Sequence, residues 1–149
     1  MNKNLVLICA TLLAISGLAL GYRELGKRKV QYVDFEKLFA SPDQYNDRNI
    51  VIEGFLFHGF EIIVLCERLE HSGLAEGHLV PKGRMIWIEG GIPPNIHDAL
   101  HIQQMMGPEE RYGKIRIKGK YESEGKYGHL GIYNYQIKPT EVELLQWSP

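Results

Sequence analysis

Cysteine is scarce in this chain of 149 residues, which contains only two. Cys9 lies inside an apolar run near the N-terminus, and Cys66 is the one cysteine in the rest of the chain. A disulfide framework within the folded part is therefore excluded, and the fold must be stabilised by burial of apolar side chains. The length suits one domain with its own core rather than two.

The chain also lacks an excess of positive charge. Its net charge is −1, and residues 1–29 hold five basic residues against one acidic residue, so residues 30–149 carry a net charge of −5. Proteins that bind the phosphate backbone of nucleic acids present a basic surface. The charge therefore argues against nucleic acid as a partner.

Recognisable catalytic motifs are missing as well. The sequence contains no nucleophile elbow, no phosphate-cradling glycine loop and no paired-carboxylate motif. Catalytic triads can assemble from distant residues, but no pattern here indicates a reaction. We expect a protein without enzymatic activity, and we assign it no cofactor.

One long apolar run is present, at residues 5–20, where sixteen positions carry no charge. This run is longer than a usual signal-peptide core and shorter than the ~20 residues of a comfortable membrane span. We predict residues 1–28 to be a signal peptide or an N-terminal membrane anchor, and we favour the anchor. Basic residues after the run favour a cytoplasmic orientation, whereas N-terminal segments of this kind usually direct export. The expected location is the cell envelope, either anchored in the inner membrane facing the periplasm or secreted to the periplasm.

Two stretches of the remaining chain resemble each other: "NIVIEGFLF" at residues 49–57 and "KIRIKGKYE" at residues 114–122. Both alternate β-branched residues with other positions, which predicts strands with one buried face. Gly54 and Gly119 interrupt them, and a glycine inside a strand usually marks a bulge or a bend. The flanking sequences differ, so the two stretches indicate two strands of one sheet rather than a duplicated domain.

Before the first of these two stretches we predict a strand at 30–33, a helix at 34–40 capped by Asp34, and a turn beginning at Ser41. Between the two stretches we predict strands at 61–67 and 84–90, separated by a polar loop at 68–83, and then a helix at 96–106. A last strand is predicted within 128–147. Three strands, a helix and two strands follow in this order. This is the order of a five-stranded Greek-key barrel of the oligonucleotide/oligosaccharide-binding (OB) type, with a helix between strands 3 and 4. We predict a mainly β domain of this type at residues 29–149, in which Gly54 and Gly119 let two strands bend.

Five segments resemble a family of small exported bacterial proteins that are uncharacterised and predicted to be OB-fold-like. These segments are "FEKLFASPDQYNDRNIVIEGFL", "IVLCERLEHSG", "MIWIEG", "YGKIRIKGKY" and "GHLGIYNYQI", and they lie within residues 31–138. The chain differs from the family at Cys66, where an aromatic residue is more usual. The resemblance implies the fold and export, and it implies no reaction.

The first candidate site is an aromatic platform. Tyr133 and Tyr135 alternate along a predicted strand, and with Tyr121 they could present rings on one face, beside His129. Aromatic faces of such barrels stack on sugars or bases, so these four residues are our candidate ligand-binding set. The alternative is that the tyrosines are ordinary half-buried strand residues and that His129 braces its turn through backbone hydrogen bonds.

The second candidate site, which the sequence supports less strongly, is a metal site. Cys66, His71 and His78 lie in the segment 66–78, while His97 and His101 are four residues apart on a predicted helix. Such ligands suit zinc or copper, but their spacings match no compact template. Cys66 also ends an apolar run, so we expect its thiol to be buried.

These patterns favour a non-enzymatic binding or scaffolding module of the bacterial cell envelope. The expected partner is another envelope protein or a small polar ligand, and the N-terminal segment would contact the membrane. One alternative is a metal-binding protein that uses the 66–78 loop. A second alternative is a protein that binds single-stranded nucleic acid or oligosaccharide through the barrel face.

Overall fold

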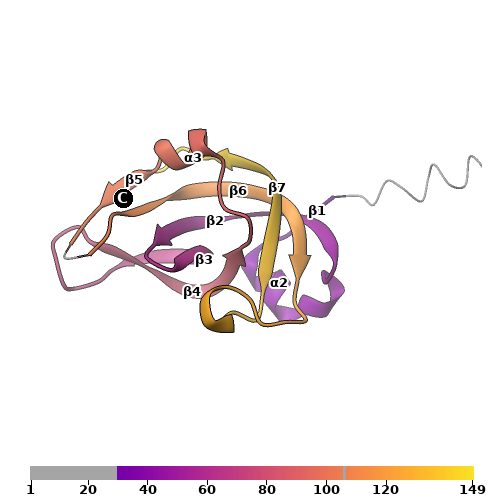
Figure 1. Ribbon diagram of the computed structural model, residues 1–149. Helices are drawn as coiled ribbons and strands as arrows, with labels where there is room; N and C mark the ends of the chain where they lie inside the picture. The colour runs from indigo at the N-terminus through magenta and orange to yellow at the C-terminus, as the bar shows by residue number, and fades with distance from the viewer. Residues whose placement is uncertain (1–29, 106) are drawn as a thin grey trace, which may run out of the picture.

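The computed structural model describes residues 30–105 and 107–149 (Figure 1). The apolar run at 5–20, predicted to be a signal peptide or an anchor, lies outside this range. Within the described residues, no helix is both long and apolar enough to cross a membrane.

The described chain is mainly β, as the sequence predicts. Its strands are β1 (Gln31–Tyr32), β2 (Arg48–Gly59), β3 (Ile62–His71), β4 (Leu79–Ile88), β5 (His101–Gln103), β6 (Glu110–Glu122) and β7 (Gln136–Leu144). They form one seven-stranded sheet in the order β1-β2-β3-β4-β7-β6-β5, and β2 also pairs with β6. This extra pairing joins β2, β3, β4, β7 and β6 into a ring (Figure 1). β4 and β7 are parallel, and the other pairs within the ring are antiparallel.

The two similar stretches of sequence are neighbours in the sheet. β2 and β6 pair without interruption from Arg48 opposite Tyr121 to His58 opposite Arg111. Alternate isoleucines of the two strands point to the inside of the ring, where Ile52 and its partner Ile117 are almost fully buried. The shared pattern therefore reflects two strands that line the same core.

The two glycines of these strands have different roles. Gly119 lies at a register shift between β6 and β7, as predicted, and a Cβ atom there would overlap the carbonyl oxygen of Lys138. Gly54 lies inside β2, as predicted, but it does not form a bulge, because it pairs with Ile115 in an unbroken register. A Cβ atom at Gly54 would lie 2.8 Å from Cε2 of Phe35, so this glycine leaves room for a neighbouring helix.

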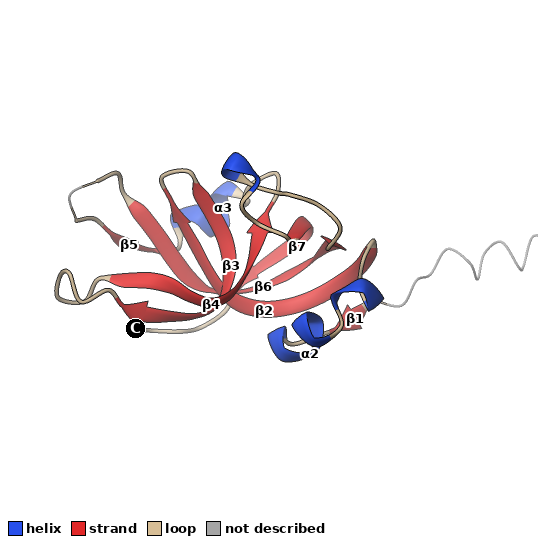
Figure 2. Ribbon diagram, turned by 90° about the horizontal axis from the view of Figure 1, so that it is seen from below, coloured by secondary structure: helices blue, strands red, loops and turns tan. Residues whose placement is uncertain are grey.

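That helix is α2 (Phe35–Ala40), and its predicted N-cap is confirmed. The carboxylate of Asp34 accepts a hydrogen bond of 2.8 Å from the backbone N–H of Lys37. Phe35 and Leu38 are buried, and α2 covers one end of the ring beside β1 (Figure 2). The short 3₁₀ helix η1 (Pro42–Gln44) follows, without a side-chain cap from Ser41.

The helix predicted at 96–106 is wrong. The observed helix α3 (Pro94–Asp98) has five residues and lies in the connection between β4 and β5. Proline in the first turn is favourable and explains the earlier start. The second half of the predicted helix is instead strand β5, which pairs His101 with Tyr112 of β6.

The long polar loop predicted at 68–83 is also wrong. β3 continues to His71 and β4 begins at Leu79, so that only residues 72–78 connect them. The pairing shifts register between Cys66 and Arg68. The many polar residues of this hairpin conceal the strand pattern, because most of its distal side chains face solvent.

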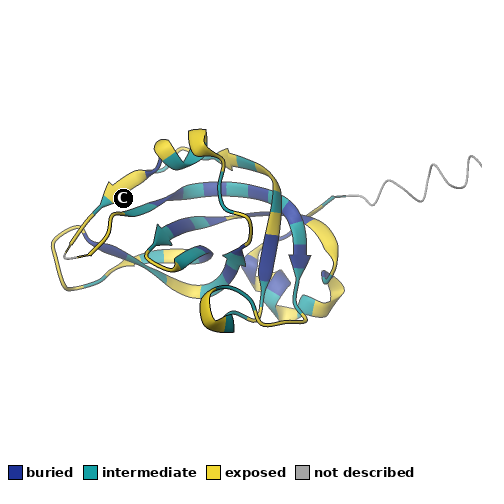
Figure 3. Ribbon diagram, viewed as in Figure 1, coloured by how far each residue is buried: buried dark blue, intermediate teal, exposed yellow. Residues whose placement is uncertain are grey.

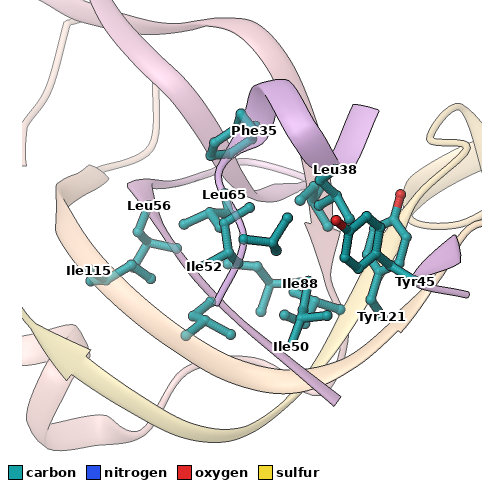
Figure 4. Close-up of a cluster of buried hydrophobic side chains, with 14 of the residues drawn as sticks. Phe35, Leu38, Tyr45, Ile50, Ile52, Leu56, Leu65, Ile88, Ile115 and Tyr121 are labelled. Atoms are coloured by element: carbon teal, nitrogen blue, oxygen red, sulfur yellow. The ribbon is translucent and has the colours of Figure 1, made fainter. Parts of the chain in front are cut away.

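Two clusters of buried apolar side chains hold the sheet. The larger one fills the inside of the ring (Figures 3 and 4). The smaller one lies among Phe57, Val64, Leu79 and Tyr112. Leu79 belongs to the distal half of the β3–β4 hairpin, so this half of the hairpin packs on the sheet rather than projecting into solvent.

Candidate binding surface at the hairpin tips

The predicted tyrosine platform is wrong. Tyr121 is fully buried inside the ring (Figure 4). Its ring stacks with that of Tyr135, with ring centroids 6.1 Å apart. Burial raises the pKa of the Tyr121 hydroxyl. Tyr135 packs against the inner cluster and Tyr133 against the smaller one. Both residues precede β7, which begins at Gln136. The strand alternation assumed for them does not apply.

His129 lies in the short turn η2 (His129–Gly131), where its Nε2 is 3.2 Å from Oε2 of Glu61 in the β2–β3 turn. His129 therefore contacts a side chain of another turn, whereas the sequence analysis considered hydrogen bonds to the backbone of its own turn. Next to it, Leu130 has a left-handed backbone (φ 56°) and an exposed side chain. Gly128 lies against Trp87 of β4 and fixes this loop on the sheet, because a Cβ atom there would be 2.6 Å from the indole ring.

The predicted metal ligands do not come together. Cys66 is fully buried, its Sγ donates to the carbonyl of Arg68 at 3.3 Å, and burial raises the pKa of its thiol to about 12. His97 lies on α3 against His58, with ring centroids 5.2 Å apart, whereas His101 follows the end of α3 and stacks on Tyr112. His71 is exposed at the end of β3. In the part of the chain that the structure describes, no three His, Cys, Asp or Glu side chains are arranged to hold a metal ion.

His78 is the buried member of a partly buried polar network between two hairpins. It is 8% exposed, and its Nε2 lies 3.0 Å from Oε2 of Glu110. The side-chain amide of Gln103 donates to the same oxygen at 2.8 Å. Gln103 also exchanges two hydrogen bonds with the backbone of Leu79, at 2.6 and 3.0 Å. The network therefore joins the tip of the β3–β4 hairpin to the β5–β6 hairpin.

A cavity of about 280 Å³ opens beside this network. Its lining residues are Phe60, His78, Met105, Gly107, Pro108 and Glu110. They come from the turns at 60–61 and 72–78, from the turn residues 104–105 and 107–109, and from the start of β6. We call the three turns, together with the cavity, the hairpin-tip surface. The two longer turns lie at the opposite end of the molecule from β1 (Figure 1).

The hairpin-tip surface is apolar and acidic. Phe60, Leu74 and Met105 are 69%, 75% and 43% exposed, and Phe60 and Met105 line the same cavity. The three turns contain Glu61, Glu76 and Glu109 and no lysine or arginine. Sequence analysis singled out His78 here but missed Phe60, Gln103 and Glu110, because their proximity depends on how the hairpins pack.

A second cavity, of about 400 Å³, lies outside β2, β6 and β7 near Tyr32. Its charged side chains neutralise each other: Arg116 binds Glu53 at 2.7 Å and Glu143 at 2.6 Å, and Lys118 pairs with Glu141. Few charged groups remain there to recognise a ligand. The hairpin-tip surface is therefore the better candidate site.

Comparison of the chain with protein-family models, with curated proteins and with solved structures gave no match. Function must therefore be argued from the geometry of the chain itself.

Proposed function

We propose that this protein is a non-enzymatic binding module of the bacterial cell envelope, built on an OB-type barrel, and that it binds another envelope protein. The order of the five-stranded ring, its parallel β4–β7 pair and the helix α3 before β6 support the OB-type assignment. Fold alone does not define function, so the proposal depends on the hairpin-tip surface.

The observation that carries the proposal is the exposure of Phe60, Leu74 and Met105 on turns that a rigid sheet holds in place. Exposed apolar side chains grouped at one place mark sites where proteins meet other molecules. Loops on a rigid scaffold are also where binding residues concentrate. The polar network of His78, Gln103 and Glu110 fixes two of the turns relative to each other, so less order has to be gained on binding.

The position of this surface fits attachment to a membrane through the N-terminal segment. The described chain begins next to β1, and the two longer turns lie at the other end of the molecule (Figure 1). A domain held at its N-terminus would present these turns away from its attachment point. We propose that they face the periplasm, where a partner protein can reach them.

Site-specific photo-crosslinking in intact bacteria tests the proposal. A photoreactive phenylalanine analogue replaces Leu74 in the full chain, and the matched control carries it at Thr140, an exposed position on β7. We expect one discrete crosslinked product from position 74 and none from position 140. Equal crosslinking at the two positions, or none at 60, 74 and 105, would contradict the proposal.

A further inference from the structure

The carboxylate of Glu110 is held in a fixed orientation at the cavity beside the hairpin tips. Both of its donors, His78 Nε2 and Gln103 Nε2, contact the same oxygen, Oε2. An ionised carboxylate only accepts hydrogen bonds, so Nε2 is the protonated nitrogen of the His78 ring. No group in the described part of the chain donates a hydrogen bond to the other oxygen, Oε1, so Oε1 is open to a ligand.

The walls of the cavity are apolar and aromatic. Phe60, Met105 and Pro108 line it, and the Phe60 ring is largely exposed. A carboxylate beside an aromatic ring and aliphatic surface is the chemistry that recognises an ammonium or guanidinium group on an apolar stem. The ring attracts the cation, the carboxylate forms a charge-assisted hydrogen bond, and the apolar walls cover the methylene groups.

No cation of the chain fills this role within the described residues. The nearest basic residue in sequence, Arg111, is engaged by Glu109 at 2.6 Å and by the carbonyl of His97 at 3.1 Å. The three turns themselves contain no lysine or arginine. The donors to Glu110 are an imidazole and an amide, so its charge is not matched by a lysine or arginine of the domain.

We propose that this cavity binds the side chain of a lysine or arginine from the partner protein. The inference rests on the proposed function, because it names the chemistry of the partner. A volume of about 280 Å³ suits a single long side chain. Leu74 is exposed in the same turn as His78, and we propose that it contacts apolar residues that flank this basic anchor. The partner segment is therefore basic, with apolar neighbours, and it complements the acidic turns.

NMR titration of the full chain in nonionic detergent tests the cavity directly. The probe is N-acetyl-arginine amide, and the observed signal is the methyl group of Met105 in protein labelled at methionine. We expect a saturable shift of this signal. N-acetyl-citrulline amide, which has nearly the same shape and no charge, should give no saturable shift.

Two variants complete the test. Glu110→Gln keeps an acceptor for His78 and Gln103 but removes the charge, and it should weaken arginine-amide binding by roughly tenfold or more. Glu141→Gln, the matched control, removes an exposed charge on β7 that pairs with Lys118 and lies outside the hairpin-tip surface, so it should leave binding unchanged. Equal binding by Glu110→Gln and the wild type, or binding of the citrulline probe, overturns the inference.

The results separate this inference from the proposed function. If position 74 crosslinks to a partner but arginine amide does not bind, the cation pocket is wrong and the binding module stands. If arginine amide binds in a Glu110-dependent way and no crosslink forms, the partner protein as source of the cation is rejected. Loss of the crosslink in Glu110→Gln, with retention in Glu141→Gln, supports both.

Discussion

The helix-covered end of the ring and the hairpin-tip surface are held together by different interactions. At the first, Phe35 and Leu38 of α2 are buried against the inner cluster. At the second, a polar network joins the turns and large apolar side chains remain in solvent. Burying those side chains would increase stability, so their exposure agrees with the binding role that we propose for this end. Buried apolar contacts stabilise the first end, whereas partly buried polar contacts join the turns at the second.

Leu38→Ala should give the largest effect on stability. Leu38 is fully buried, and removing such a side chain leaves a cavity that costs about 2–5 kcal/mol. The measurement is the free energy of unfolding from chemical denaturation. Leu74→Ala is the control at the hairpin tips and should change stability by less than about 0.5 kcal/mol. Similar losses in the two variants would remove the contrast between the two ends.

Gly54→Ala should have the next largest effect. The added Cβ would lie 2.8 Å from the Phe35 ring and 2.9 Å from the carbonyl oxygen of Cys66, so the Phe35 ring and the β3 backbone have to shift. Overpacking of this kind costs about 1–3 kcal/mol. Gly107→Ala is the control, because a Cβ atom there meets nothing within 4 Å. Unchanged thermal stability of Gly54→Ala would show that these neighbours adapt without cost.

Gln103→Ala should loosen the hairpin-tip surface without unfolding the ring. The variant loses two hydrogen bonds to the Leu79 backbone and one to Glu110, and each contributes about 0.5–1.5 kcal/mol. We expect faster amide hydrogen exchange at Leu79. The neighbouring Gln104, whose side chain donates to the Gly107 carbonyl within the turn, is the control. If Gln104→Ala had the same effect on Leu79, the network would not be what joins the hairpins.

Acid should produce the smallest effect, through His58. Burial lowers the pKa of His58, and nearby His97 and Arg111 lower it further. The unfolded chain therefore takes up a proton on this residue at a higher pH than the folded chain does. The stabilisation is fully present above the unfolded pKa of about 6.5 and is lost as the pH falls below it. His58→Gln should reduce the drop in melting temperature between pH 7.5 and 5.5; an unchanged drop would assign it to other groups.

Sequence analysis predicted the elements whose pattern is local. The alternating isoleucines of β2 and β6 and the Asp34 cap of α2 depend on neighbours a few residues away. The distal β3–β4 hairpin and β5 escaped prediction because their pairing follows from packing on other strands. The candidate site escaped for the same reason, since His78 and Glu110 are 32 residues apart and Phe60 carries no distinctive pattern.

The pairing of β2 with β6 has a consequence for how the chain folds. β2 and β3 can pair as soon as a short turn forms, but the ladder from Arg48 to Tyr121 joins residues far apart in sequence. Contacts of long sequence separation form slowly, because the intervening chain must first be ordered. Until then one edge of β2 offers unpaired amides and carbonyls beside a row of isoleucines and can aggregate with other chains. The rate-limiting step of folding is therefore expected to be the capture of this edge by β6, the last strand but one to be synthesised.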